Sequence, residues 1–447
     1  MSIALAGAVG LTLAGCSSTG GKRAEDARKA ASAQGKAAVN TPRWTVAMVT
    51  HSGDGDTFWD IVQSGAKQAA VKDNINFLYS HSDEAQQQAQ LVDAAVDKKV
   101  DGLIVLADSR QHIIRLAHEQ AADGSWNFRV TDDWDLTGQV PHDCVSWTNL
   151  YPSGTCDPVT SVMPDWQGRI WWVTRQGRVG TVDPADGTIK SVQLPGEEIQ
   201  NSFSVAKDGV SIVSDHALYS FEAAADGTPK AVWRQTYDRG TGTKPGSVNQ
   251  GSGTTPDLFG AGEDYVAITD NADDRMNILV YRRGRDVTDD RRLVCKVPVF
   301  GSGASTTDNS LISYGNSLVV ENNYGYENIT SLTFGRSVVG GVTRVDVRKD
   351  GSGCDTVWES KVRSPSTVPK LSTANGLLYF YTKDPNSLGI DAWYLTAVDF
   401  RTGEPRWKQL AGTGIAYDNN WAPVTLGPDG TAYVGVFNGL VAVRDGK

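Results

Sequence analysis

Hydrophobic positions in the first third of the chain predict short strands that alternate with amphipathic helices. Buried-type strands are expected at residues 44–50, 75–80 and 101–107. Apolar residues at helical spacing follow each strand, within 58–70, within 85–96, and at Ile113, Ile114, Leu116 and Ala117. Thr57 and Asp60 match a capping box, so the first helix is expected to begin at the end of a glycine-rich loop. This alternation predicts a parallel, doubly wound sheet whose ligands bind beyond the carboxyl ends of its strands.

From about residue 126 the helical period disappears and a repeat of short alternating strands begins. Six times a turn glycine precedes such a strand, at intervals of 41 to 61 residues: Gly168, Gly209, Gly262, Gly315, Gly376 and Gly430. A second strand, an acidic turn and an outer strand that often carries Trp follow most of these starts. Repeats of this kind indicate a β-propeller, and their number predicts six blades. The last repeat ends without an outer strand, so we expect a strand from 126–150 to complete it and close the ring.

The amino terminus has the pattern of an exported lipoprotein. An apolar run ends at "LAGC", and this run resembles the segment before the lipid-modified cysteine of bacterial lipoproteins, which places the lipid on Cys16. The alternative is an ordinary signal peptide or a short buried helix in which the cysteine occurs by chance. No Lys or Arg precedes the run, which departs from the usual basic start of export signals. Residues 17–43 are small and polar and predict a flexible tether. No later stretch is apolar over the length of a membrane-spanning helix.

These patterns divide the chain into four parts. We predict a lipoprotein signal peptide over 1–16, a tether over 17–43, a partial α/β lobe over 44–123 and a six-bladed propeller over 124–447. The fold class is therefore multidomain, with a small parallel-sheet domain followed by an all-β propeller.

Composition narrows the compartment and the class of partner. The 447 residues carry a net charge of −10, which repels nucleic acid and anionic lipid headgroups. Besides Cys16 there are four cysteines, an even number that favours disulfides outside the cytoplasm. Cys144 and Cys156 are the expected pair because their bond closes one short loop, and Cys295 with Cys354 follows by elimination. No CxxC spacing occurs in the sequence, so we assign no metal.

The first loop and helix carry a family resemblance. The stretches "THSGDGDTFWDIVQSGAKQAA" and "YSHSDEAQQQAQLVDAAVDKKVDGLIVLADS", with the lipoprotein start, resemble ribose-type substrate-binding proteins of sugar ABC transporters. The resemblance implies that Phe58 or Trp59 stacks on a sugar ring, that Asp54 and Asp56 accept hydroxyl hydrogen bonds, and that Asp108 adds a polar contact. Two carboxylates in this loop would repel an anion, so a neutral polyol fits better than a phosphate.

Each of these residues has an alternative role in the fold. Asp56 and Asp108 could equally cap helices, and one of Phe58 and Trp59 is expected in the core because adjacent helical residues do not share a face. The family closes its sugar between two lobes, whereas the pattern here stops near residue 123. We therefore expect a half-site that binds weakly or not at all.

The propeller carries a second resemblance. "AVDFRTGEPRW" (397–407) is similar to the repeat of the pyrroloquinoline-quinone-type propeller superfamily, in which an acidic turn precedes a strand bearing Trp. The resemblance implies architecture more than activity, because the superfamily includes dehydrogenases and noncatalytic envelope lipoproteins. Its dehydrogenases have adjacent cysteines, which this sequence lacks. Four aspartates before blade starts could face the central funnel or could instead fix turns: Asp165, Asp257, Asp308 and Asp418.

Together the patterns predict a lipid-anchored extracytoplasmic binding protein without catalytic activity and without a cofactor. Its partial lobe has a sugar as candidate ligand, and its propeller an envelope protein or a glycan. The alternative is a propeller enzyme, either a lactonase or a quinone- or calcium-dependent dehydrogenase.

Overall fold

The structure is a computed structural model that describes residues 45–50, 75–81, 102–105, 111–120, 126–140, 157–328, 332–427 and 430–444, with single residues between 59 and 70. Cys16, Asp54, Asp56, Phe58, Asp108, Cys144 and Cys156 lie outside the described residues, as do the tether and the helix expected near 84–97. Within the described part, no helix is both long and apolar enough to cross a membrane.

The amino-terminal strands form a small parallel sheet. Strands β1 (Thr45–Thr50), β2 (Asn76–His81) and β3 (Gly102–Val105) are ordered β2-β1-β3, and both pairings are parallel. The described residues between 59 and 70 are helical, and Trp59 and Ala70 among them are buried. The described part thus contains three parallel strands and several helical residues between the first two, and the doubly wound α/β domain stays a prediction.

The helix predicted after residue 107 is wrong, because these residues form a strand. β4 (His112–Gln120) pairs antiparallel with β5 (Trp126–Asp135). Ile113 is buried and Ile114 is exposed, as expected for adjacent residues of a strand. Cross-strand polar contacts favour this pairing: His112 Nδ1 and Asp133 Oδ1 are hydrogen-bonded at 2.6 Å, and Arg115 Nε forms an ion pair with Asp132 Oδ2 at 2.6 Å.

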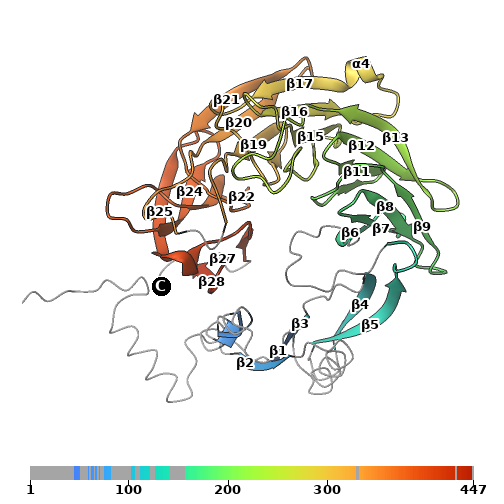
Figure 1. Cartoon of the computed structure of the whole chain (residues 1–447), viewed down its shortest axis with the longest axis horizontal. Helices are drawn as coiled ribbons and strands as arrows, with labels where there is room; N and C mark the ends of the chain where they lie inside the picture. Colours follow the sequence, from blue (N-terminus) through green and yellow to red (C-terminus); the bar gives the residue numbers. More distant parts are fainter. Residues whose placement is uncertain are drawn as a thin grey trace, which may run out of the picture.

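Six consecutive sheets make up the rest of the chain, arranged around an arc (Figure 1). Five of them have four antiparallel strands each, and the last has three. The first three sheets contain β6 (Val159–Pro164), β7 (Ile170–Thr174), β8 (Arg178–Val182) and β9 (Ile189–Gln193); β10 (Ser204–Ala206), β11 (Gly209–Val213), β12 (Ala217–Ala223) and β13 (Pro229–Thr236); and β14 (Asp257–Phe259), β15 (Tyr265–Thr269), β16 (Asn277–Arg282) and β17 (Leu293–Pro298). A one-turn helix, α4 (Asp289–Arg292), precedes β17.

The other three sheets repeat the order. They contain β18 (Ile312–Tyr314), β19 (Ser317–Glu321), β20 (Val342–Val347) and β21 (Cys354–Ser360); β22 (Lys370–Ser372), β23 (Leu377–Thr382), β24 (Ala392–Asp399) and β25 (Pro405–Thr413); and β26 (Val424–Leu426), β27 (Ala432–Val436) and β28 (Gly439–Val443). A short 3₁₀ turn, η2 (Ile415–Tyr417), leads into the last sheet. Five of the six blade-start glycines lie between the first and second strands of a sheet, where a tight hairpin turn is needed, and Gly209 is the first residue of β11.

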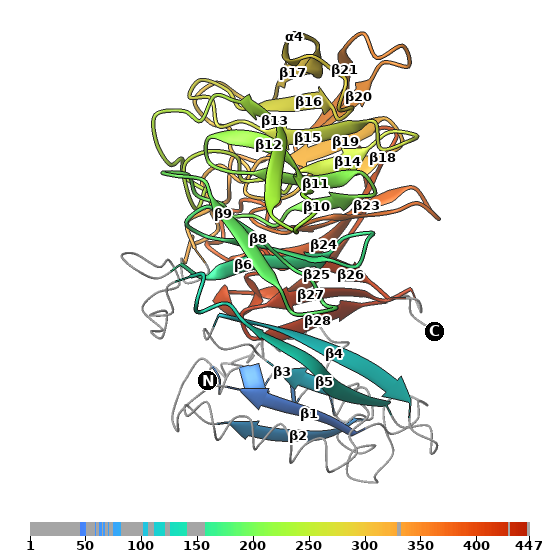
Figure 2. The same cartoon turned by 90° about the vertical axis from the view of Figure 1, so that its right-hand side faces the viewer.

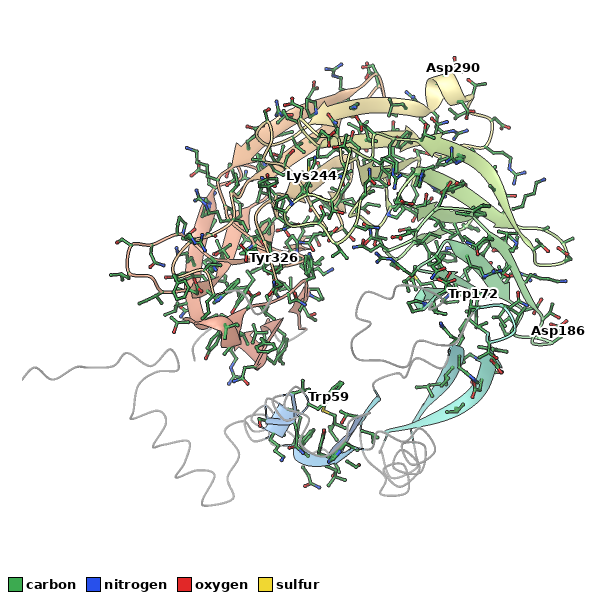
Figure 3. All side chains as sticks on the ribbon, in the orientation of Figure 1. Trp59, Trp172, Asp186, Lys244, Asp290 and Tyr326 are labelled. Atoms are coloured by element: carbon green, nitrogen blue, oxygen red, sulfur yellow. A yellow bond between two sulfur atoms is a disulfide. The ribbon has the colours of Figure 1, made fainter. Side chains whose placement is uncertain are left out.

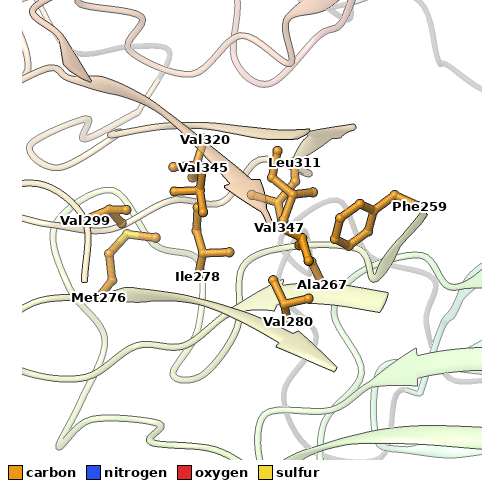
Figure 4. Close-up of a cluster of buried hydrophobic side chains, with 11 residues drawn as sticks. Phe259, Ala267, Met276, Ile278, Val280, Val299, Leu311, Val320, Val345 and Val347 are labelled. Atoms are coloured by element: carbon orange, nitrogen blue, oxygen red, sulfur yellow. The ribbon is translucent and has the colours of Figure 1, made fainter. Parts of the chain in front are cut away.

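Apolar clusters join successive blades. Figure 4 shows the cluster between the third and fourth blades, where Ile278 and Val280 of β16 pack with Val320 and Val345. Similar clusters join the first blade to the second, the second to the third, the fourth to the fifth, and the fifth to the sixth. Each fully buried aliphatic side chain contributes about 1.5–3 kcal/mol relative to exposure, so these interfaces hold the arc together.

The predicted closure of the ring is wrong for the described part of 126–150. β5 pairs with β4 and not with β28, so the last blade has three strands. The β4–β5 hairpin instead packs on the first blade, where Ile113, Trp134 and Leu136 meet Ile170 and Trp172. The boundary predicted at residues 123 and 124 therefore falls inside one hairpin. Figures 1 and 2 both place this hairpin and the parallel sheet on the side of the arc between its first and last blades.

A disulfide joins the rims of two blades. Cys295 of β17 and Cys354 of β21 are bonded, at a sequence separation of 59. The pair expected by elimination is thus present, and it fastens the outer strands of the third and fourth blades to each other.

Candidate functional site

Buried polar residues gather at one end of the blades. They follow the second strand of a blade or precede its first strand, and they include Asp270, Asn271, Thr306, Thr307, Asn309, Glu321, Asn322, Asn323, Ser366, Thr367, Asp418 and Asn419. Many of them bind loop backbone. Asn322 Nδ2, for example, donates to the carbonyl oxygens of Ala304 and Gly340 at 2.9 and 3.0 Å. This polar layer positions the long loops of that face, as buried polar groups must be paired.

A small cavity opens within this layer, between the fourth, fifth and sixth blades. Its volume is about 120 Å³, and its wall includes Tyr326, Arg336, Lys383, Trp393 and Asp418. Figure 3 places Tyr326 on the inner side of the arc of blades. At roughly 30 Å³ of liquid volume per water molecule, the cavity holds about four waters or one small polar group.

Tyr326 and Asp418 form one side of the cavity. The Tyr326 hydroxyl donates to Asp418 Oδ1 at 3.1 Å and lies 3.2 Å from Asn420 Oδ1. The Tyr326 ring also packs edge-on against Trp421, with ring centroids 4.9 Å apart. Burial raises the pKa of Asp418 to about 6, although the Tyr326 hydrogen bond opposes this rise. Asp418 is therefore an acceptor whose charge changes at mildly acidic pH.

Lys383 forms the opposite side and is fully engaged. Its Nζ lies 2.5 Å from Thr333 Oγ1, 3.5 Å from Asp391 Oδ1 and 5.0 Å from the centre of the Trp393 ring. Burial lowers the pKa of Lys383, and the charge of Asp391 opposes that effect. Burial would raise the pKa of Asp391, yet hydrogen bonds from Thr333 and Gly335 together with Lys383 hold it below its ordinary value. Lys383 and Asp391 therefore form an ion pair with an N–O distance of 3.5 Å. Both are hydrogen-bonded to Thr333, in the loop after β19.

Two further carboxyl groups lie deeper in the fourth blade. Burial raises the pKa of Glu321 to about 8 and that of Asp308 to about 7. Glu321 Oε1 accepts from Asn309 Nδ2 and, at 3.3 Å, from Asn323 Nδ2. Asp308 Oδ2 accepts from the backbone of Val248 at 2.7 Å. Neither group lines the cavity. Their elevated pKa values therefore result from burial and do not indicate a role in the site.

The sequence-predicted aspartates have three different environments. Asp418 lies in the cavity wall. Asp257 begins β14 and Asp308 precedes β18; both are half-buried, and desolvation raises the pKa of Asp257 to about 6. Asp165 lies in the β6–β7 hairpin and accepts from the backbone of Gln167 and Arg169, both at 2.9 Å, which fixes that turn. Trp59 is buried, as expected for one member of the aromatic pair.

Sequence reasoning missed Tyr326, Arg336, Lys383, Asp391 and Trp393. A signal for Lys383 was present, since polar residues directly follow the alternating second strand in several repeats. Examples are Asp270 after β15, Asn322 after β19 and Lys383 after β23. Among the described residues, no cluster of three or more His, Cys, Asp or Glu side chains is arranged to hold a metal.

Comparison with known proteins assigns the chain to no family. No family model matches the chain. An uncharacterized protein of Archaeoglobus fulgidus is 26% identical over 314 residues, which cover 64% of this chain and 60% of the relative. The chain thus matches somewhat over half the length of that relative.

Solved structures with partial similarity to the chain include two bacterial proteins that match over more than half of it. A proposed 6-phosphogluconolactonase from Bacteroides fragilis has a TM-score of 0.41 and 12% identity, covering 74% of this chain and 90% of that one. The quinohemoprotein alcohol dehydrogenase of Comamonas testosteroni has a TM-score of 0.40 and 12% identity, covering 62% and 52%. A carbohydrate transporter of Acidothermus cellulolyticus, solved with myo-inositol, is 48% identical over a short part, 14% of this chain and 22% of that one, with a TM-score of 0.14. The β-propeller-like fold itself follows from the six consecutive antiparallel sheets described above.

Proposed function

We propose that this protein is a noncatalytic, lipid-anchored binding protein of the cell envelope, whose propeller holds the end of a glycan in the Tyr326–Lys383 cavity. The observation that carries the proposal is the saturation of the charged groups there. Lys383 is bound by Thr333 and Asp391, and Asp418 accepts from Tyr326. Groups held in this way can recognise a ligand, whereas a nucleophile or a general base needs an available atom facing its substrate.

The chemistry of the cavity wall supports a neutral, hydroxyl-rich ligand. Tyr326 and Trp393 supply ring surfaces, and Asp418, Thr333 and Ser337 supply hydrogen-bonding oxygens. Aromatic faces combined with a few convergent polar groups are typical of sites that bind polar small molecules. The small volume admits only a hydroxyl-bearing edge of a terminal sugar unit, so the rest of a bound glycan would lie outside the cavity.

The envelope location rests on two independent features. The run that ends at Cys16 supports lipidation, followed by the 17–43 tether. The Cys295–Cys354 disulfide supports an oxidising compartment, because such bonds are rare where thiols are kept reduced. We also propose that the 44–123 lobe is the remnant of a sugar-binding lobe, and its parallel β2-β1-β3 sheet supports this origin.

A propeller enzyme is the second candidate. The observation that favours it is the lowered pKa of Lys383 in the same cavity as the raised pKa of Asp418, because such pairs occur at catalytic sites. In that case the lysine would have to leave Asp391 to react.

Titration calorimetry on the full chain carrying Cys16→Ser tests the binding function. We expect one or more neutral sugars to bind, and Glu327→Gln at the exposed edge of the cavity to change the affinity. Lactone hydrolysis that disappears in Lys383→Met, without measurable sugar binding, would support the enzyme instead. Mass spectrometry of the membrane fraction tests the anchor, since wild-type Cys16 should carry lipid and Cys16→Ser should move the protein to the soluble fraction.

A further inference from the structure

Two neighbouring loops carry large apolar side chains into solvent. The loop after β19 exposes Leu332 and Phe334, at 52% and 68%, and the loop after β23 exposes Leu388 and Ile390, at 78% and 44%. Single exposed apolar residues are ordinary, but four on two adjoining loops form a patch that usually marks an interaction surface. We call these four residues the apolar loop pair.

The two loops are locked to each other. Asn386 N donates to Gly335 O at 2.9 Å, and Asp391 accepts from Thr333 N at 3.0 Å and from Gly335 N at 2.9 Å. Gly335 packs so closely on the second loop that a Cβ there would lie 2.6 Å from Asn386 O. The apolar side chains are therefore presented by a fixed backbone and do not depend on a disordered loop.

Phe334 has a backbone conformation that is costly for its residue type. Its φ is +50°, in the left-handed region where bulky residues are rare. The hydrogen bonds around Thr333 and Gly335 maintain this conformation, and the side chain it carries is mostly in solvent. Strain of this kind persists where the surroundings over-determine it, often at binding sites.

Cationic groups flank the apolar loop pair. Arg336 is exposed and forms no salt bridge with any described carboxylate. Arg363 lies at the base of both loops, since its carbonyl accepts from Lys383 N at 3.0 Å and its side chain packs against Gly340. Two nearby acids are already paired, Asp391 with Lys383 and Asp384 with Lys408, and the exposed Glu327 lines the cavity beside Arg336. The patch is therefore apolar with Arg336 and Arg363 at its edge, on a chain whose net charge is −10.

We infer that the apolar loop pair docks on the phospholipid surface, with Phe334 and Leu388 entering the headgroup boundary and Arg336 facing lipid phosphate. Apolar tips with basic neighbours suit an interface of hydrocarbon and anionic headgroups. The repulsion from the rest of the chain decays within about 8 Å at physiological salt, so it does not act on a local contact. The choice of a membrane over a protein partner rests on the proposed anchor, since Cys16 and the tether would hold the propeller near that surface.

Vesicle flotation tests the inference without the anchor. The probe is vesicles of phosphatidylcholine and phosphatidylglycerol in equal parts, mixed with the full chain carrying Cys16→Ser. We expect this protein to float with the vesicles, and Phe334→Asn with Leu388→Asn to weaken the partition by about tenfold or more. Asn tolerates the left-handed region, so the first substitution should not unfold the loop.

The matched control is Trp166→Asn. Trp166 is 69% exposed in the β6–β7 hairpin, at the opposite ends of the strands, and its replacement should leave flotation unchanged. Arg336→Gln should weaken flotation at low salt only. Absence of flotation by the parent protein, or equal loss in the Trp166 variant, would overturn the membrane assignment. Because glycan binding is measured separately in solution, either result leaves the proposed function independently testable.

Discussion

Tyr326 and Asp418 are joined by a hydrogen bond of 3.1 Å, although 92 residues separate them in the sequence. Tyr326 comes from the loop after β19 of the fourth blade, and Asp418 precedes the first strand of the sixth. The bond therefore spans the fifth blade on the loop-bearing face. The same hydrogen bond joins two residues of the cavity wall and links the fourth blade to the sixth.

Replacing Tyr326 by Phe should destabilise the fold and raise the pKa of Asp418 in the cavity wall. The variant loses the donor to Asp418 while keeping the ring, and we expect a cost of about 1 kcal/mol in the free energy of unfolding. The pKa of Asp418 should rise further above 6, because the lost hydrogen bond favours its charged form. Urea denaturation measures the first effect. Tyr314→Phe is the control, since Tyr314 is 54% exposed at a hairpin turn, and an equal loss in both variants would contradict the structural role.

The buried carboxyl groups of the fourth blade predict that stability falls as pH rises. The folded pKa values of Glu321 and Asp308, about 8 and about 7, exceed their ordinary values of 4.5 and 3.8. Each group binds its proton more tightly when folded, so its contribution is complete below the ordinary pKa. That contribution is lost as pH rises through the folded pKa, by up to about 1.4 kcal/mol per pH unit for each group.

Glu321→Gln should reduce this pH dependence. Glutamine keeps the oxygen that accepts from Asn309 and Asn323 and cannot ionise. We expect its free energy of unfolding to exceed that of the wild type at pH 8 and to approach it near pH 5, as measured by urea denaturation at both values. Glu327→Gln, at an exposed position, should leave the slope unchanged. A wild-type stability that is constant between these values would disprove the elevated pKa values.

The propeller repeat could be predicted because each blade contains its own signals. A turn glycine and an alternating strand depend only on local φ and on burial of one face, so Gly168 and the strand after it predict a hairpin without knowledge of the rest. The Cys295–Cys354 bond could be expected only by elimination, because β17 and β21 become neighbours only when two blades pack.

The errors arose where pairing overrides local spacing. Ile113, Ile114, Leu116 and Ala117 fit a helical period, yet β4 is stabilised by Asp132 and Asp133 across the hairpin and by Trp134 against the first blade. The cavity was missed for a related reason. Tyr326, Lys383 and Asp418 belong to three blades, and single-sequence periodicity does not indicate which loops converge.

Removal of the disulfide should destabilise the third and fourth blades. In the loop-entropy account, a bond across 59 residues contributes about 4 kcal/mol. We expect Cys295→Ser with Cys354→Ser to lower the urea midpoint strongly, and a reducing agent to do the same to the wild type but not to the variant. Mass mapping of the bond provides the check. A reducing agent that lowers both midpoints equally would place the sensitivity at other cysteines.

Trp134→Ala tests whether the β4–β5 hairpin is an integral neighbour of the first blade. Trp134 is buried against Ile170, Trp172 and Val182, and Arg115 lies over its ring at 5.4 Å. Truncating a buried Trp typically costs about 3–5 kcal/mol, so the variant should lose the hairpin's docking first. Limited proteolysis is the direct measurement, because cleavage within 112–135 should accelerate while the second to sixth blades stay resistant. Val130→Ala is the matched control, as Val130 is 54% exposed on the same hairpin. If cleavage in Trp134→Ala proceeds at the wild-type rate, the hairpin is not held by this contact, and the side of the first blade must be covered in another way.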